Sequence, residues 1–341
     1  MNTNMIQKKV LITGASGFIG STVVDKSLEL GYETWAGIRK SSNRQFLKDE
    51  RIRFIDLNYN DKNKLKLQLQ KFINKYGKIH HIIHIAGLTK AKSKFDFDKV
   101  NYEQTRTLVD VLIELDLIPD SFTLMSSLSV IGPGDEVNFK PLMANHKPNP
   151  NTAYGRSKLK AEKYLKGLNN FPYIILRPTG VYGPRDKDYF ILMKAVKLGL
   201  NVGAGFQKQI LTFIYSEDLA DVIFRIIEKG VVRKEYIVSD GDYYTDSEFN
   251  KIVQNALNKK SVISFKIPLF IVKCAACISE KTAVLFGKVS TFNNDKYKIM
   301  KQRNWNCDIT PLKKDLDFKP KYKLKEGVKK TIEWYKVQGW L

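Results

Sequence analysis

Three glycines near the N-terminus constrain the fold more than any other feature of the chain. Residues 10–20 read VLITGASGFIG, in which Gly14, Gly17 and Gly20 stand three residues apart. An apolar run rich in β-branched residues precedes them (KKVLIT), and the stretch after them repeats apolar side chains at helical spacing (FIGSTVVDKSLELG). Strand, glycine turn and helix in this order predict the first unit of a parallel sheet covered by helices.

A turn of this kind also suits a bound dinucleotide. Gly14 permits the tight turn, Gly17 lets the backbone approach a pyrophosphate, and Gly20 lets helix and strand pack closely. The phosphates then lie at the helix N-terminus, where backbone N–H groups are free to bind them. We therefore expect a dinucleotide here, with a glycine-rich turn that binds nothing as the alternative.

The second predicted strand, YETWAGIRK, ends where a dinucleotide enzyme contacts the adenosine ribose. An Asp or Glu there would accept hydrogen bonds from the free 2′-hydroxyl of NAD, but this chain has Arg39 and Lys40. They are followed by Ser41, Ser42 and Arg44. A guanidinium pairs with a 2′-phosphate through two hydrogen bonds. These residues favour NADP(H), with NAD(H) as the alternative, because solvated charges are common in so basic a chain.

Composition limits the class of protein. The chain has 341 residues, 43% of them hydrophobic, and no long uninterrupted apolar segment, which is typical of a globular protein with a large core. Its 57 Lys and Arg against 35 Asp and Glu give a net charge of +22, which favours anionic partners. The basic residues are scattered and are not interleaved with aromatic ones, so we expect a small-molecule substrate and no nucleic-acid partner.

The cysteines and the N-terminus predict a cytoplasmic location. Cys274, Cys277 and Cys307 are too few for a disulfide framework, and no charged segment with an apolar signal core precedes Val10. Cys274 and Cys277 form a CxxC pair inside the apolar run IPLFIVKCAACI, without a second pair to complete a metal site. We therefore expect packing residues and no metal.

Strands and helices continue to alternate up to about residue 182. The further predicted strands are RIRFIDLNYND, IHHIIHIAG, SFTLMSSLSVIG and FPYIILRPTGVYGP, and LTFIYSEDLADVIFRIIEKG predicts a strand and a helix that return to the sheet. This alternation predicts an α/β fold with a Rossmann-type doubly wound parallel sheet. We assign residues 1–182 and 206–240 to an NAD(P)-binding domain, and 183–205 and 241–341 to a smaller interleaved substrate lobe.

Tyr154 and Lys158 carry the strongest chemical signal. They stand one helical turn apart in AYGRSK and so project from the same face of the predicted helix. A phenol titrates near pH ~10, and a nearby ammonium favours the phenolate, so Lys158 should bring Tyr154 into a useful range. Ser127, just past a predicted strand, would hydrogen-bond the substrate oxygen. These residues predict acid–base catalysis, with Lys158 also binding the nicotinamide ribose.

These motifs resemble those of a known family. TGASGFIG, HIAG, SSLSVIG, YGRSK and RPTGVYGP occur in an order and spacing similar to those of the extended short-chain dehydrogenase/reductases, the NAD-dependent epimerase/dehydratase family. The resemblance implies that Ser127, Tyr154 and Lys158 form the catalytic trio. It also implies a homodimer through the helices around Thr105 and Leu159.

The same resemblance assigns further contacts. Besides Tyr154 and Lys158, the cofactor contacts that it implies are Gly14, Gly17, Phe18, Ile19, Gly20, Asp56, Leu57, Ala86, Gly87, Pro178, Thr179 and Val181. To these we add Arg39 and Lys40, and Ser126 at the end of a predicted strand. Ile131 stands where the family has a tyrosine near the substrate, which removes one hydroxyl contact. Substrate contacts are therefore expected from Thr89, Ser127 and Ile131.

Two branches of the family use this trio, and three features favour a reductase of ketones over a nucleotide-sugar enzyme. Arg39 favours NADP(H). The stretch GAGFQKQILTFIYSED lacks the arginine of many nucleotide-sugar enzymes, with Lys208 as a candidate substitute. The C-terminal stretch resembles that of dihydroflavonol reductases and 3β-hydroxysteroid dehydrogenases. A nucleotide-sugar epimerase or dehydratase with recycled NAD stays open, since Thr89, Lys90 and Lys92 could meet a diphosphate.

Residues 263–288 add an indication about the substrate. They are broadly apolar but interrupted by Lys273 and by SEKT, and so fall short of the roughly 20 residues of a membrane-spanning helix. They could line an apolar pocket, rest on a membrane surface with their lysines at the headgroups, or form the core of the small lobe. We favour an apolar or amphipathic substrate, sterol-like or a keto-lipid.

Overall fold

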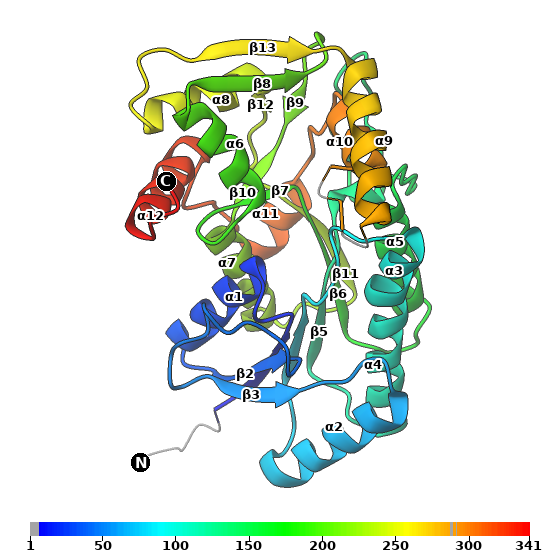
Figure 1. The fold of residues 1–341 in the computed structure, drawn as a ribbon. Coiled ribbons are helices and arrows are strands. Elements are labelled where there is room, and N and C mark those ends of the chain that lie inside the picture. Colours follow the sequence, from blue (N-terminus) through cyan, green and yellow to red (C-terminus); the bar gives the residue numbers. More distant parts are fainter. Residues whose placement is uncertain (1–6, 287–288, 291) are drawn as a thin grey trace.

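A computed structural model describes residues 7–286, 289–290 and 292–341, so Gly287 and Lys288 at the end of the apolar segment lie outside the described residues. Seven parallel strands form one sheet in the order β11-β6-β5-β4-β1-β2-β3 (Figure 1). They are β1 Lys9–Thr13, β2 Glu33–Ile38, β3 Arg53–Asp56, β4 His81–His84, β5 Ser121–Met125, β6 Tyr173–Pro178 and β11 Lys234–Val238. The predicted Rossmann-type sheet is confirmed, with its switch point between β1 and β4.

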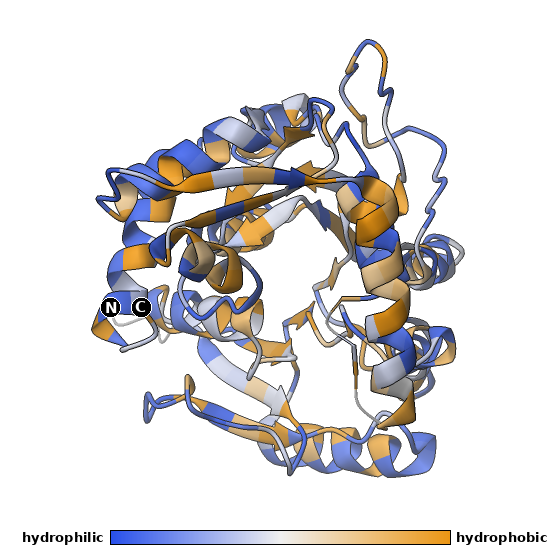
Figure 2. Ribbon diagram, turned by 45° about the horizontal axis from the view of Figure 1, so that its top comes forward, coloured by the Kyte–Doolittle hydropathy of each residue, from blue (hydrophilic) through white to orange (hydrophobic). Residues whose placement is uncertain are grey.

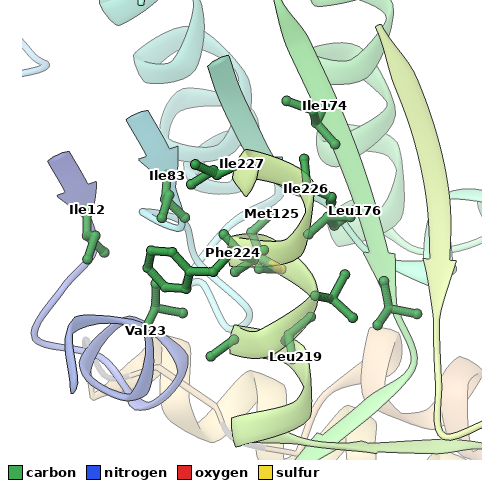
Figure 3. Close-up of a cluster of buried hydrophobic side chains, with 14 of the residues drawn as sticks. Ile12, Val23, Ile83, Met125, Ile174, Leu176, Leu219, Phe224, Ile226 and Ile227 are labelled. Atoms are coloured by element: carbon green, nitrogen blue, oxygen red, sulfur yellow. The ribbon is translucent and has the colours of Figure 1, made fainter. Parts of the chain in front are cut away.

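Helices cover both faces of this sheet because its strands are apolar on both sides. One face packs against α1 (Phe18–Glu29) and α7 (Ser216–Glu228). The other packs against α2 (Lys62–Tyr76), α4 (Gln104–Glu114) and α5 (Ala153–Lys166). Figure 3 shows side chains of α7 turned toward the strands. The connection before α4 contains the short helices α3 (Lys94–Asp98) and η1 (Lys99–Glu103), the latter a π-helix.

The second lobe lies beyond the carboxyl ends of the strands (Figure 1). It contains three strand pairs: β8 (Leu200–Ala204) with β13 (Ile263–Ile267), β9 (Ile210–Leu211) with β12 (Tyr244–Thr245), and β7 (Gly180–Tyr182) with β10 (Phe213–Tyr215). Its helices are α6 (Asp188–Lys197), α8 (Asp246–Ala256), α9 (Leu269–Leu285), α10 (Asn294–Lys301) and α12 (Leu324–Val337). The strands β7 and β10 and the helices α6, α8 and α12 enclose a second core.

One sequence prediction about these elements is wrong. The strand β10 does not return to the main sheet but pairs with β7 in a separate two-stranded sheet. The edge position of the main sheet beside β6 is occupied by β11. The helix α11 (Thr310–Leu316), within the range that we assigned to the substrate lobe, packs on the main sheet. Its buried residues and their neighbours share a core with α7 and β11: Ile309, Leu312, Leu316 and Phe318.

Candidate active site

The helix α5, which carries Tyr154 and Lys158, is held at its N-terminus by two side chains. Thr152 caps the helix and accepts a hydrogen bond from the Gly155 amide at 3.0 Å. Asp295, at the start of α10, accepts hydrogen bonds from the amides of Ala153 (2.7 Å) and Tyr154 (3.2 Å). A carboxylate is favourable here because it meets the positive end of the helix dipole. Asp295 thereby ties the second lobe to the backbone of Tyr154.

A buried ion pair holds the next turns of α5 against the sheet. Glu162 pairs with Arg177 of β6 at 2.6 Å, and both side chains are 1% exposed. Arg177 also bonds Glu235 at 2.9 Å and the Ala144 carbonyl at 2.7 Å. Ser126 donates its hydroxyl to Glu162. The Ser126 side chain, predicted to contact the cofactor, therefore points into this buried network.

The structure brings Ser127, Tyr154 and Lys158 together. Ser127 lies two residues beyond the end of β5, and its hydroxyl accepts a hydrogen bond from the Ser129 amide at 3.2 Å. The ring of Tyr154 is half-buried and packs edge-on against Phe97. Lys158 is buried and donates from Nζ to the Met125 carbonyl at 2.8 Å. An ammonium has three N–H groups, so two remain for ribose hydroxyls.

The titration of this pair differs from the sequence prediction. Burial raises the pKa of Tyr154 to about 12, and the neighbouring Ser127 hydroxyl opposes that rise. Burial also lowers the pKa of Lys158 to about 8, against the attraction of Glu162. Desolvation thus outweighs the expected effect of the ammonium on the phenol. At neutral pH the phenol is protonated and Lys158 remains mostly an ammonium.

Asn101 is a buried member of the site that sequence reasoning missed. It lies in the π-helix η1, and its side chain donates to the Leu88 carbonyl (3.0 Å) and to the Ser157 hydroxyl (2.9 Å). A Cβ on Gly87 would lie 2.9 Å from Asn101 Oδ1 and 3.0 Å from Lys158 Nζ. A side chain at position 87 would therefore displace the Asn101 amide or the Lys158 ammonium. A single π-turn leaves no periodic signal in a sequence, although π-turns are frequent at functional sites.

The glycine turn fits a pyrophosphate. Gly14 has a φ of +68°, and a Cβ there would come within 2.7 Å of the Ala86 amide nitrogen. A Cβ on Gly20 would lie 2.1 Å from the Gly14 carbonyl oxygen, whereas one on Gly17 would meet that oxygen alone, at 3.3 Å. Gly17 caps α1 without a side-chain hydrogen bond. The Gly17 amide already donates to the Gly14 carbonyl at 3.0 Å, so a phosphate here would meet the first amides of the helix, at Phe18 and Ile19.

The predicted adenosine end lies at β2 and β3. Ile38 and Asp56 are register partners at the ends of these strands, so Asp56 lies beside the start of the basic run. Arg39 and Lys40 are exposed, and the Arg39 amide donates to the Ser42 hydroxyl at 3.0 Å. The Arg39 guanidinium thus has solvent around it for an anionic ligand. Leu57 is buried, and its side chain lies close to Gly37 of β2.

A cavity of about 320 Å³ begins at Ser127 and extends into the second lobe. Pro178 and Thr179, two predicted cofactor contacts, form part of its wall, while Val181 is half-buried against the core instead. The apolar side chains that line the cavity are Leu128, Leu192, Val202, Leu211, Phe213, Phe249, Ile299, Met300 and Trp305. Tyr189, Gln209, Asp246, Asn250 and Gln302 add polar groups. Among the described residues, no Lys or Arg lines this cavity.

Three residues considered at the sequence level lie away from the cavity. Ile131 is buried in the core of the main sheet at 3% exposure. Thr89 is exposed, and neither residue lines the cavity within the described part of the chain. Lys208 lies over the ring of Phe139, 5.9 Å from its centroid. A substrate in the cavity therefore meets none of these three as a wall residue.

Gln302 is a cavity residue without any sequence signal. It is 3% exposed, and its Nε2 donates to the carbonyls of Gly132 and Asn304, each at 3.2 Å. Because both partners are acceptors, the orientation of the amide follows from them. Its Oε1 has no hydrogen-bond partner within residues 7–286, 289–290 and 292–341. A buried acceptor without a donor is costly, so Oε1 is an unsatisfied polar atom on a residue of the cavity wall.

Comparison with known proteins agrees with this arrangement. The model of the NAD-dependent epimerase/dehydratase family matches residues 10–239. The chain belongs to this family. As a member it is an oxidoreductase of the NAD-dependent epimerase/dehydratase family, and the resemblance seen in its motifs is confirmed.

Similar proteins within the family act on different substrates. The chain is 28% identical to the UDP-glucose 4-epimerase of Vibrio cholerae, over 96% of this chain and 95% of that protein. It is 23% identical to the ceramide reductase of Caulobacter vibrioides, over 97% of this chain and 96% of that protein. The solved structure of dTDP-glucose 4,6-dehydratase from Bacillus anthracis, in complex with NAD, matches with a TM-score of 0.75 at 19% identity and covers 97% of each chain. That likeness shows the shared fold.

Proposed function

We propose that this enzyme is an NADP(H)-dependent reductase of an apolar or amphipathic ketone, such as a sterol-like or keto-lipid substrate. The observation that carries the proposal is the wall of the cavity. The chain has a net charge of +22, yet the described lining is largely apolar and holds no cation for a diphosphate. Nucleotide-sugar substrates carry at least two negative charges, whose burial without a partner is expensive. An uncharged ketone carries no such cost.

The residues at Ser127 suit the reduction of a carbonyl. NADPH, held by the glycine turn and Lys158, would supply the hydride. Ser127 hydrogen-bonds the carbonyl oxygen and orients it. Tyr154, protonated at neutral pH, donates its proton to that oxygen as the carbonyl becomes an alcohol. Lys158 places a positive charge one turn away, which favours the phenolate that remains.

Gln302 narrows the substrate class further. Its unpaired Oε1 accepts a hydrogen bond from a hydroxyl or an amide N–H on the substrate. The ceramide reductase among the similar proteins is in keeping with this, because a ceramide has long apolar chains together with an amide N–H and hydroxyl groups. We therefore favour a keto-lipid that carries such a donor over one that does not.

A nucleotide-sugar epimerase or dehydratase is the second candidate, and the identity to the Vibrio cholerae epimerase favours it. The two candidates differ in what happens to the nicotinamide. A reductase exchanges its cofactor in each turnover, whereas an epimerase or dehydratase returns the hydride to the same substrate and keeps its cofactor bound.

One experiment separates them. The freshly purified protein is denatured, the released nucleotide is identified by mass spectrometry, and NADPH oxidation is followed with a panel of lipid and steroid ketones. We expect substoichiometric nucleotide, and NADPH oxidation that is faster for ketones with a hydroxyl or amide N–H. In Gln302→Leu that preference should fall by about tenfold. Near-stoichiometric NAD, with UDP-glucose or dTDP-glucose converted without net oxidation, would overturn the reductase proposal.

The preference for NADP(H) has its own test in Arg39→Ala. Loss of a guanidinium paired with a 2′-phosphate should weaken NADPH binding by about 10- to 100-fold, and NADH binding by about twofold or less. Fluorescence titration of both cofactors measures the difference. Arg51→Ala is the matched control, because Arg51 is an exposed arginine already paired with Asp49. Equal losses for NADPH and NADH in Arg39→Ala would remove the phosphate assignment.

A further inference from the structure

The second lobe carries apolar side chains that the described chain leaves uncovered. They lie on β8, β13 and α9, where Figure 2 shows hydrophobic residues along all three elements. We call them the α9 surface: Leu200, Val202, Ile263, Phe265, Phe270, Ile271, Ile278 and Leu285. Each is at least 42% exposed. So many large apolar side chains in neighbouring elements mark an interaction surface and not the occasional exposed residue of an ordinary protein.

The two strands present an apolar face. Ile263 pairs in register with Leu200, and Phe265 pairs with Val202. Side chains two residues apart in a strand share a face, and register partners point the same way, so these four residues form one patch. Within the described residues β13 pairs with β8 alone.

The helix α9 turns its wider apolar side outward. Phe270, Cys274 and Ile278 recur at four-residue spacing and are exposed, whereas Val272 and Ala276 face inward and are buried. No described helix is long and apolar enough to cross a membrane. A 17-residue helix of this kind is suited to lie flat in the boundary between headgroups and acyl chains.

Lysines outnumber acidic residues around the α9 surface, where Lys266 is paired with Asp246 at 3.0 Å. Between residues 259 and 286 the sequence has five lysines, Lys259, Lys260, Lys266, Lys273 and Lys281, and one acidic residue, Glu280. The Glu280 carboxylate accepts hydrogen bonds from Asn294 at 2.8 and 3.1 Å. Lys273 and Lys281 are exposed on α9 itself. Lysines beside apolar side chains complement anionic lipid headgroups, because their stems lie along the apolar layer while the ammonium reaches the phosphate.

We propose that the α9 surface docks on an anionic lipid bilayer, with α9 lying in the interface. Continuity with the cavity supports this occupant, because Val202 belongs both to the surface and to the cavity wall, and α10, on which α9 packs, contributes Ile299 and Met300. An apolar ketone could then pass from the bilayer to Ser127 without crossing water. That delivery role rests on the proposed function; the docking itself does not.

Co-sedimentation of the whole chain with vesicles tests the proposal. One vesicle is phosphatidylcholine alone, and the other contains roughly one-third phosphatidylglycerol. We expect at least about tenfold tighter partitioning to the anionic vesicles at low salt, weakening as salt is added. Wild-type protein that stays in the supernatant with both vesicles would overturn the proposal. Because no substrate is present, this outcome is separate from failure of the reductase proposal.

Two double variants locate the contact. Phe270→Gln with Ile278→Gln removes apolar contact, and Lys273→Glu with Lys281→Glu reverses charge; each should weaken binding by about tenfold or more. Leu67→Gln with Val337→Gln is the matched control, since these side chains are 61% and 81% exposed on α2 and α12. The control should bind as the wild type does. All six positions are exposed, and circular dichroism verifies that the variants fold.

The result could also identify another occupant. Sedimentation velocity could show a dimer that Phe270→Gln with Ile278→Gln dissociates, while the wild type does not bind anionic vesicles. In that case the α9 surface joins two copies of the chain, and the proposal is wrong. Binding that all three double variants retain would also contradict it, because the lipid contact would then lie elsewhere.

Discussion

Replacing Tyr154 by phenylalanine should lower kcat for ketone reduction by about 10²- to 10⁴-fold, while the Kd for NADPH changes by no more than about twofold. The phenol is protonated at neutral pH, since burial raises its pKa to about 12, and it is the proton donor in the proposed reaction. Phenylalanine keeps the ring and its packing on Phe97 but has no proton to give. Steady-state kinetics with the best ketone of the panel measure the loss.

Tyr164→Phe provides the matched control for this variant. Tyr164 lies on the same helix α5, and its hydroxyl donates to Asp110 on the outer side of the helix. Loss of that hydroxyl should leave kcat within about a factor of two, because the residue touches neither the cavity wall nor Ser127. Near-normal turnover in Tyr154→Phe, or equal losses in the two variants, would refute the role of Tyr154.

Replacing Glu162 by alanine should lower the free energy of unfolding by about 3 to 5 kcal/mol. The substitution leaves the guanidinium of Arg177 in the core with Glu235 as its remaining charged partner, and it removes the acceptor of the Ser126 hydroxyl. A buried charge that loses its most buried partner has less compensation for its lost hydration. Urea denaturation followed by circular dichroism measures the change.

Asp120→Ala is the control for the ion pair. Asp120 pairs with Lys78 at 2.7 Å, but both side chains are solvated, so its loss should cost about 1 kcal/mol or less. The loss of unfolding free energy in Glu162→Gln should lie between those in Asp120→Ala and Glu162→Ala. The amide oxygen of glutamine still accepts a hydrogen bond, although the negative charge is lost. A loss in Glu162→Ala no greater than that in Asp120→Ala would show that Arg177 finds water or another partner.

The main features of the site were predictable because they depend on neighbours in the sequence. A glycine turn between a strand and a helix needs only residues 10–20 to be recognised, and Tyr154 and Lys158 face the same way because they are one helical turn apart. The alternation of strands and helices likewise predicted the parallel sheet. The elements β11 and α11, of five and seven residues, were missed. Equally short strands such as β1 were found because a glycine turn or a longer helix follows them in the alternating pattern.

The sequence by itself determined the nucleotide-binding architecture and the pair Tyr154 and Lys158, since local spacing sets which side chains share a face. Only the tertiary structure decided the rest. Asp295 lies 142 residues beyond the amide of Ala153 that it caps, and Gln302 lies 170 beyond the Gly132 carbonyl that orients it. Desolvation, which moves the pKa of Tyr154 upward, likewise depends on everything packed around the ring. Contacts between such distant residues leave no periodic trace, because packing brings them together.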